Sequence, residues 1–206
     1  PGRQQVDTAV LPESRRADVV QRIASACAEG QQAYWVCPLI EESEAVQAEA
    51  AETTAKLLAE ALPGLSIGLV HGRMKPNERD EVMNAFRQAG IDLLVATTVI
   101  EVGVDVPNAS LMIIENAERM GLSQLHQLRG RVGRGNRKSA CVLMYKGPLG
   151  RIAKARLGVL RDSTDGFVIA ARDLELRGPG EVLGTRQTGD QQFRVADPGR
   201  DQALMN

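Results

Sequence analysis

Five short apolar runs recur along the chain, and longer segments with a different periodicity separate them. The runs lie at residues 34–37, 67–70, 93–96, 111–114 and 140–144. Because they lack polar alternation, they are typical of strands that are covered on both faces of a sheet. The segments between them mostly place apolar residues three and four positions apart, as at Val20, Ile23, Ala24 and Cys27, which indicates helices with one buried face.

The alternation of strands and helices predicts an α/β fold with a doubly wound, mainly parallel sheet flanked by helices. One helix is expected to begin at Pro76, because proline fits the first helical position, and to end just before Gly90. In sheets of this kind, ligands bind in loops at the carboxyl ends of the strands. We therefore expect ligand-binding residues at that edge.

The pattern changes from about residue 147. Residues 150–162 form a basic helical stretch, residues 166–173 a second short helix, and residues 174–189 are rich in Gly, Arg and Gln. We place a boundary near Lys146, between a main domain over residues 1–146 and a helical hairpin with an extended loop over residues 147–206. The first three residues look like a mid-chain linker, so we expect a piece of a longer protein.

Charge and cysteine content narrow the classes of function. The formal net charge of −1 excludes a globally basic surface, so a local cluster of cations would have to hold any nucleic acid. Cys27, Cys37 and Cys141 lie in apolar stretches without C-x-x-C spacing, which suits buried thiols rather than disulfides or a metal site. No stretch approaches the roughly 18 apolar residues of a membrane span. We expect a cytoplasmic protein without a membrane partner.

The most informative segment is QLHQLRGRVGRG, residues 124–135. Helical spacing would place Gln127, Arg131 and Arg134 together on one face, at i, i+4 and i+7. Residues 129–138 hold five cations and no acid, since Arg129, Arg137 and Lys138 add to the pair. Paired guanidinium groups on a rigid element suit the charge of a transferring phosphoryl group. Spacing alone fits equally well a basic patch that grips DNA phosphates.

A second segment, VATTVIEVGVDVPNA at residues 95–109, begins on a predicted strand and continues through a polar turn. Thr97 and Thr98 stand at the carboxyl end of that strand, where hydroxyl and backbone N–H groups can hold a phosphate. Asp105 could accept hydrogen bonds from a ribose hydroxyl. Taken by itself, the segment also fits a plain strand followed by a Gly-Asp turn.

These two segments carry a resemblance to superfamily 2 helicases. QLRGRVGR, residues 127–134, resembles the sixth helicase motif, Q-x-x-G-R-x-x-R, and the longer QLHQLRGRVGRG is similar to the RecG and transcription-repair-coupling branch. In such helicases the domain is RecA-like. The resemblance implies that Arg131 and Arg134 reach across a cleft to the ATP phosphates, and that Gln127 helps to organise the same site.

Residues 95–109 are similar to motif V of these helicases. This implies that Thr97 contacts the nucleic-acid backbone, while Gly103 and Asp105 lie near the nucleotide. Upstream, VHGRMKPNERDEVM resembles the loop and helix that follow motif IV, which makes His71 a candidate contact to a DNA phosphate. A lone His in a loop is otherwise a surface or capping residue. Tyr34 and the adjacent Trp, in the motif IV strand, are interpreted as structural.

The tail ARDLELRGPGEVLGTRQTG, residues 171–189, distinguishes the branches. It resembles the translocation motif shared by RecG and the transcription-repair coupling factor, and the ending GTRQTG favours the RecG type. Without that resemblance, it would be interpreted as a Gly-Pro-rich loop with solvated arginines. The resemblance makes Arg172, Arg177, Arg186 and Gln187 candidates for DNA contact or coupling.

The sequence contains no G-x-x-x-x-G-K-[ST] phosphate loop and no acidic magnesium motif. The family places them in a preceding RecA-like domain, which would hold most of the ATP and Mg²⁺, and a wedge domain stands further upstream. The chain should therefore not hydrolyse ATP alone. The resemblance implies a bacterial, nucleoid-associated translocase that remodels forks and Holliday junctions, with a monomer favoured. The alternatives are a transcription-repair coupling translocase and a non-catalytic nucleic-acid-binding module.

Overall fold

The computed structural model describes residues 5–38, 43–97 and 106–177. The chain up to Leu176 forms one compact unit. In chain order, its strands are β1 (Val6–Pro12), β2 (Gln32–Cys37), β3 (Ile67–Val70), β4 (Leu93–Thr97), β5 (Ala109–Ile114) and β6 (Ser139–Tyr145). The helices are α1 (Arg16–Ala28), α2 (Glu44–Ala61), α3 (Pro76–Arg87), α4 (Leu122–Arg129), α5 (Arg151–Asp162) and α6 (Gly166–Arg177), and η1 (Glu13–Arg15) and η2 (Ala117–Arg119) are short 3₁₀ turns.

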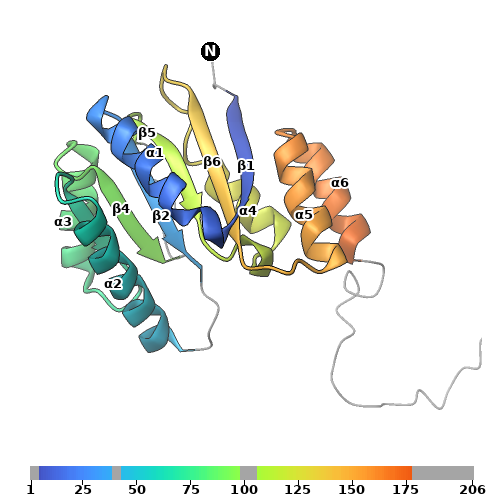
Figure 1. Cartoon of the computed structure of the whole chain (residues 1–206), viewed down its shortest axis with the longest axis horizontal. Helices are drawn as coiled ribbons and strands as arrows, with labels where there is room; N and C mark the ends of the chain where they lie inside the picture. The colour runs from blue at the N-terminus through green and yellow to red at the C-terminus, as the bar shows by residue number, and fades with distance from the viewer. Residues whose placement is uncertain (1–4, 39–42, 98–105, 178–206) are drawn as a thin grey trace, which may run out of the picture. The chain divides into compact units, whose positions relative to one another are not determined.

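The described strands form one parallel sheet in the order β1-β6-β5-β2-β4-β3 (Figure 1). The central strands β2, β4 and β5 are buried along their whole length. Such strands have no solvent-facing side, which explains why their sequences are continuously apolar. All five predicted strands are present, each with at most two extra residues at an end.

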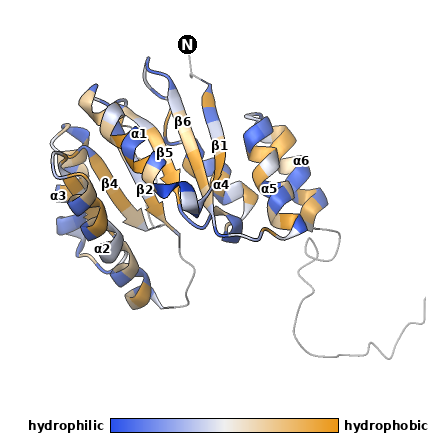
Figure 2. Cartoon of the chain, in the orientation of Figure 1, coloured by the Kyte–Doolittle hydropathy of each residue, from blue (hydrophilic) through white to orange (hydrophobic). Residues whose placement is uncertain are grey.

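Successive side chains of each strand serve two separate cores, one on each face of the sheet. Tyr34 and Val36 of β2 belong to the core that is covered by α3, α4, α5 and α6. Trp35 and Ala33, which is two positions earlier on the same strand, belong to the core that is covered by α1 and α2. In Figure 2 the strands of the sheet are coloured mostly as hydrophobic. The predicted doubly wound α/β fold is confirmed, and Tyr34 and Trp35 are buried structural residues.

The edge strand β1 is an element that the hydrophobic pattern did not predict. It pairs in parallel with β6 from Val6 to Pro12. Only Val6 is fully buried, and the remaining positions are exposed or half-buried. An edge strand of this kind has too few buried positions to produce a continuous apolar run.

The helix that follows β3 begins as predicted. Pro76 is its first residue, and the Glu78 side chain accepts a hydrogen bond of 3.3 Å from the N–H of Lys75. The two predicted helices beyond residue 147 are also present as α5 and α6. Contacts of α5 with β1 and η2 keep this hairpin in the same compact unit as the sheet. The domain boundary near Lys146 stays a prediction, and it lies one residue after the end of β6.

Candidate functional site

The arginine segment is helical only over its first part. α4 ends at Arg129, Gly130 is its C-cap, and the chain then makes an irregular turn into β6. Gly133 has a φ of 83°, a left-handed conformation that glycine adopts without a steric penalty. The prediction that Gln127, Arg131 and Arg134 share one helical face is therefore wrong. Gln127 lies on the helix, and the two arginines lie on the turn after it.

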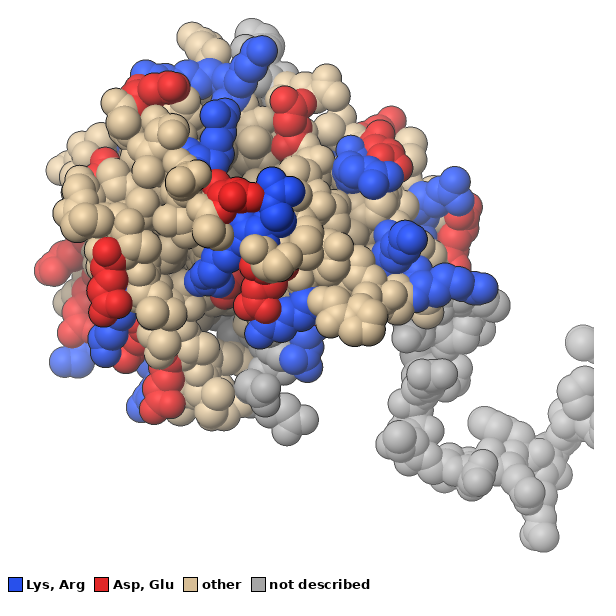
Figure 3. Space-filling view, in the orientation of Figure 1, with Lys and Arg blue, Asp and Glu red and all other residues tan. Residues whose placement is uncertain are grey.

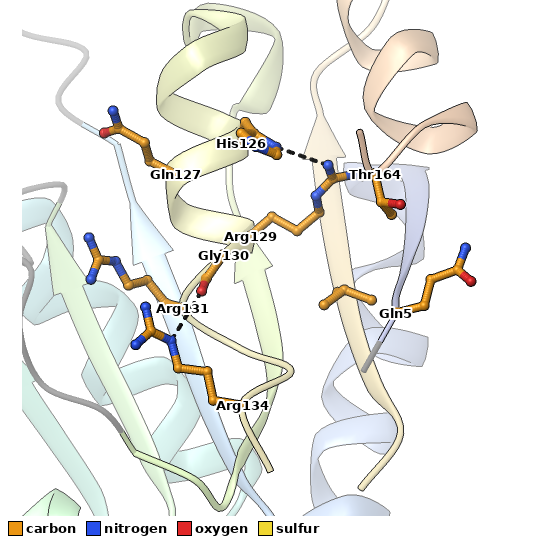
Figure 4. A pocket seen from close by; sticks show the side chains of 9 residues that line it. Gln5, His126, Gln127, Arg129, Gly130, Arg131, Arg134 and Thr164 are labelled. Atoms are coloured by element: carbon orange, nitrogen blue, oxygen red, sulfur yellow. Dashed lines mark hydrogen bonds between the residues drawn. The ribbon is translucent and has the colours of Figure 1, made fainter. Parts of the chain in front are cut away.

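The turn nevertheless brings these three side chains to one place. Gln127, Arg131 and Arg134 line a single open pocket of about 530 Å³. In Figure 4 all three extend to the same side of the end of α4. Arg134 and Gln127 are exposed, whereas Arg131 is half-buried. An amide and two guanidinium groups thus face a space that is large enough for a phosphate chain.

The pocket lies at the edge of the sheet opposite to the one expected. Its wall includes Gln5 and Val6 at the start of β1, and the arginine turn leads directly into the start of β6. Because all strands are parallel, these are the amino ends. The expectation that ligand-binding residues gather at the carboxyl edge is wrong for the arginine pair. A turn that follows a helix in such a fold necessarily enters the sheet at its amino edge.

Arg129 differs from its two neighbours, although the sequence grouped it with the available cations. It is 3% exposed, and its guanidinium points away from Arg131 and Arg134 (Figure 4). Nη1 donates to the carbonyl oxygens of Leu160 at 2.7 Å and Ser163 at 2.8 Å. This cation is buried, and these two hydrogen bonds hold the end of α5.

Further contacts of Arg129 reach β1 and the preceding turn of its own helix. Nη1 reaches the hydroxyl of Thr8 on β1 at 3.3 Å, and Nη2 lies 3.0 Å from Nδ1 of His126. Arg137, another of the five cations, donates to the carbonyl of Glu29 at the end of α1 at 2.7 Å. Two of the counted cations therefore cap helices, which leaves a smaller cluster for any external phosphate.

The carboxyl edge carries two of the described DNA-contact candidates, Thr97 and His71. Thr97 ends β4 and is 3% exposed. The His71 side chain is 12% exposed, and its Nε2 lies 3.6 Å from Oε1 of Glu52 on α2. Neither is freely exposed in this chain, so their contact with DNA stays a prediction. They lie at the opposite edge of the sheet from the arginine pocket.

The other predicted site residues lie largely outside the described part of the chain. Thr98, Gly103, Asp105, Arg186 and Gln187 belong to the segments that are not described. Arg172 is on α6, where its Nη1 donates to Oε2 of Glu175 at 2.7 Å, and Arg177 is the last residue of that helix. Their roles stay predictions.

Charge on the visible surface follows the low net charge. Figure 3 shows basic and acidic side chains interspersed over that face rather than one continuous basic surface. Among the described residues, no cluster of three or more His, Cys, Asp or Glu side chains could hold a metal ion. No helix in the described ranges is long and apolar enough to cross a membrane.

The three cysteines are buried free thiols within the described structure, as predicted. Burial raises the pKa of Cys27 to about 11, with a smaller effect from Asp92. Burial likewise raises the pKa of Cys37 and of Cys141 to about 12. None of them lines the arginine pocket.

Sequence reasoning missed the opposite wall of the pocket, which Gln5, His126 and Thr164 form together with Arg129. Gln5 and Thr164 are brought there only by the tertiary fold, and no local pattern marks them. Arg129 did have a signal. It follows Leu122 and Leu125 at helical spacing, on the buried stripe of α4. Its place on that stripe predicts burial rather than exposure.

Fold and site together define a class of protein. The model of the helicase conserved C-terminal domain matches residues 15–136, which include Gln127, Arg131 and Arg134 of the arginine pocket. The chain therefore belongs to the helicase C-terminal domain family.

Within this family, the similarity to the RecG type is confirmed. The chain is 66% identical over 206 residues to the ATP-dependent DNA helicase RecG of Escherichia coli K12, which covers all of this chain and 30% of that protein. It is 47% identical to the RecG of Thermotoga maritima, over all of this chain and 26% of that protein. The chain thus spans less than a third of the length of these relatives.

Solved structures agree with this assignment. A structure of RecG bound to a three-way DNA junction matches 99% of this chain and 26% of its own, with a TM-score of 0.75 and 44% sequence identity. Domain 2 of the DEAD-box helicase Mss116p, bound to an RNA duplex, matches 77% of this chain and 60% of its own, with a TM-score of 0.59 and 18% identity. The second likeness concerns the fold alone.

Proposed function

We propose that this chain is the second RecA-like motor domain of a longer ATP-dependent DNA translocase. That protein would remodel branched double-stranded DNA, such as replication forks and Holliday junctions, in repair and recombination. The observation that carries the proposal is the convergence of Gln127, Arg131 and Arg134 on one open pocket in a chain of the helicase C-terminal family. The match to a structure of RecG bound to a three-way DNA junction supports the choice of branched DNA as the substrate.

In this proposal the pocket receives the phosphates of an ATP that a preceding domain holds together with Mg²⁺. Arg131 and Arg134 would stabilise the negative charge that spreads over the oxygens of the transferring phosphoryl group, and Gln127 would orient the site. Arginine contacts of this kind are worth about 10³–10⁵ in rate in related phosphoryl-transfer enzymes. An open pocket suits such a role, because the preceding domain that holds the ATP has to face it.

The remaining candidates would divide between nucleotide and DNA. Gly103 and Asp105 would lie near the nucleotide, and Thr97, Thr98 and His71 would contact the DNA backbone. Arg172, Arg177, Arg186 and Gln187 would couple the motor to double-stranded DNA. Contact of one segment, residues 97–105, with both ligands would allow each ligand to bias the same element, which is the requirement for coupling hydrolysis to movement.

The test is ATP turnover by the full-length protein on forked DNA, linear duplex DNA and single-stranded RNA. Forked DNA should give the strongest stimulation, and Arg134→Ala should reduce the stimulated kcat by about 10³-fold while DNA affinity is retained. A matched control is Arg22→Ala, because Arg22 is exposed on α1, which covers the other face of the sheet. Equal stimulation by RNA would refute the substrate, and unchanged turnover in Arg134→Ala would refute the arginine's role.

A further inference from the structure

The segment that carries Arg131 and Arg134 is short, irregular and held at a few points. Val132 is fully buried, and Gly135 packs so closely on the backbone before β5 that an added Cβ would lie 2.4 Å from the carbonyl oxygen of Pro107. The other fixed point is the residue at which α4 ends, Arg129. The position of the two arginines therefore depends on where the end of α4 is held.

Arg129 is held by elements that are distant in sequence. The carbonyl oxygens of Leu160 and Ser163 that accept its hydrogen bonds stand at the C-terminal end of α5. The C-terminal end of a helix carries partial negative charge, so it stabilises a buried guanidinium. Nη1 carries two N–H groups for the two carbonyls, and Nη2 reaches His126 at the same time. A Lys ammonium has a single nitrogen and cannot reach both places.

His126 extends this connection to the start of α6. Arg129 can only donate, so Nδ1 of His126 accepts the bond and the imidazole ring is neutral. On its other side the ring packs on Gly166, where an added Cβ would lie 3.3 Å from Nε2. Thr164, in the turn between α5 and α6, lines the same pocket as Arg131 and Arg134. The end of α4 and the α5–α6 turn are thus joined as one packed, hydrogen-bonded unit.

We propose that Arg129 is a positioning residue for Arg131 and Arg134, and that its bonds to the end of α5 make their placement depend on the α5–α6 turn. This inference rests on the proposed function. The Arg129 guanidinium is buried and points away from the arginine pair, so we assign it no contact with the phosphates. Its loss should therefore reduce kcat and leave the KM for ATP nearly unchanged, because the transition state is more sensitive than ground-state binding to misplaced groups.

The experiment is a double-mutant cycle in the full-length protein with saturating forked DNA. Arg129→Gln should lower kcat by about 10- to 100-fold, with the KM for ATP within about twofold of the wild type. In an Arg134→Ala background, the same substitution should lower kcat by less than about threefold, because residues that act as a unit are not additive. Arg129→Lys, which keeps the charge and one donor group, should give an intermediate kcat and covers the case in which the Gln variant does not fold.

The matched control is Arg137→Gln. Arg137 belongs to the same segment and also donates to a carbonyl at the end of a helix, but that helix is α1. Thermal unfolding of all variants is measured alongside, and kcat should change by less than about twofold in the control. A similar loss in Arg137→Gln would reduce Arg129 to general stabilisation.

Two outcomes separate this inference from the proposed function. If Arg134→Ala lowers kcat, and Arg129→Gln lowers it by the same factor in both backgrounds, the positioning role is overturned and the proposed function stands. If Arg134→Ala leaves kcat unchanged, both the catalytic role and the positioning role are overturned.

Discussion

Ala89 adopts a left-handed backbone conformation just beyond α3, with a φ of 58°. The N–H of Ala89 donates to the carbonyl of Phe86 at 3.2 Å, and the N–H of Gly90 to that of Ala85 at 2.9 Å. This bond pair terminates the helix in the Schellman pattern, in which glycine is preferred at the position that Ala89 occupies. The glycine that the sequence offered as the end signal, Gly90, stands one position later.

Ala89→Gly should therefore stabilise the chain by about 0.5–1 kcal/mol, because it relieves the strain of the left-handed conformation. The free energy of unfolding, from denaturant titration followed by circular dichroism, measures the effect. Ala50→Gly is the matched control, since Ala50 is exposed in the interior of α2 and the same substitution should cost about 1 kcal/mol there. A loss of stability in both variants would contradict the assignment.

The buried thiols should make the free energy of unfolding vary with pH in the alkaline range. An unfolded thiol titrates near about pH 8.5, and burial raises the pKa of Cys141 to about 12. The folded state then holds its protons more tightly, so the stabilising effect is complete below about pH 8.5 and is lost as the pH rises from there towards 12. The free energy of unfolding should fall between about pH 9 and 11. Cys141→Ala should make this fall shallower, because one of the three buried thiols no longer titrates; an unchanged slope would exclude Cys141 as a source of the fall.

At the scale of elements, the arginine turn and the segment before β5 are packed against each other through Gly135 and Pro107. Glycine is required there by the close approach of the two backbones. Gly158 is the opposite case. It lies in the interior of α5 with no atom within 4 Å of an added Cβ. The same residue type thus has a packing reason at one position and none in this chain at the other.

The same substitution should have opposite effects at these two glycines. Gly135→Ala should destabilise the chain by about 1–3 kcal/mol, because the new methyl group would collide with backbone atoms. Gly158→Ala should stabilise it by about 0.5–1 kcal/mol through helix propensity. Denaturant titration of the two variants and of the unchanged chain would measure both differences in the free energy of unfolding. Equal effects at the two sites would show that the approach of Gly135 to Pro107 does not constrain the turn.

At the scale of the whole molecule, the sheet separates two groups of candidate residues. The arginine pocket lies at the amino edge, and Thr97 and His71 lie at the carboxyl edge. Coupling of ATP hydrolysis to movement on DNA requires that both ligands act on the same structural element. Under the proposed function, the rigid parallel sheet between the two groups would be that element. Under the proposed function, the open pocket predicts that the rest of the ATP site comes from another domain of the full-length protein.

The isolated chain should therefore show no ATP hydrolysis above background, with or without forked DNA, whereas the proposed function requires the full-length protein to hydrolyse ATP. Release of inorganic phosphate by purified chain and by full-length protein measures this difference. The chain carrying Arg134→Ala, purified in parallel, reports any contaminating ATPase. Turnover by the isolated chain that disappears in Arg134→Ala would mean that these residues form a complete site by themselves.

Local physics accounts for most of what the sequence determined. Continuous apolar runs specify strands buried on both faces, Pro76 specifies a helix start, and apolar surroundings specify the buried thiols. The motif residues Gln127, Arg131 and Arg134 were also identified before the structure, and the structure brings them to one pocket. These features depend on neighbours within a few positions, or on a motif that can be recognised from residue types and their spacing.

Only the tertiary structure decided the rest. β1 was missed because an edge strand has too few buried positions to show a hydrophobic pattern. The end of α4 at Arg129 was missed because the helical spacing of the residues continues in the sequence beyond Gly130, where the helix stops. Arg129 caps α5, whereas Arg131 and Arg134 face the pocket. This difference depends on partners of Arg129 that lie some thirty to more than one hundred residues away in the sequence. Charge and residue type were readable from the sequence, but the direction of a side chain was fixed by distant elements that pack around it.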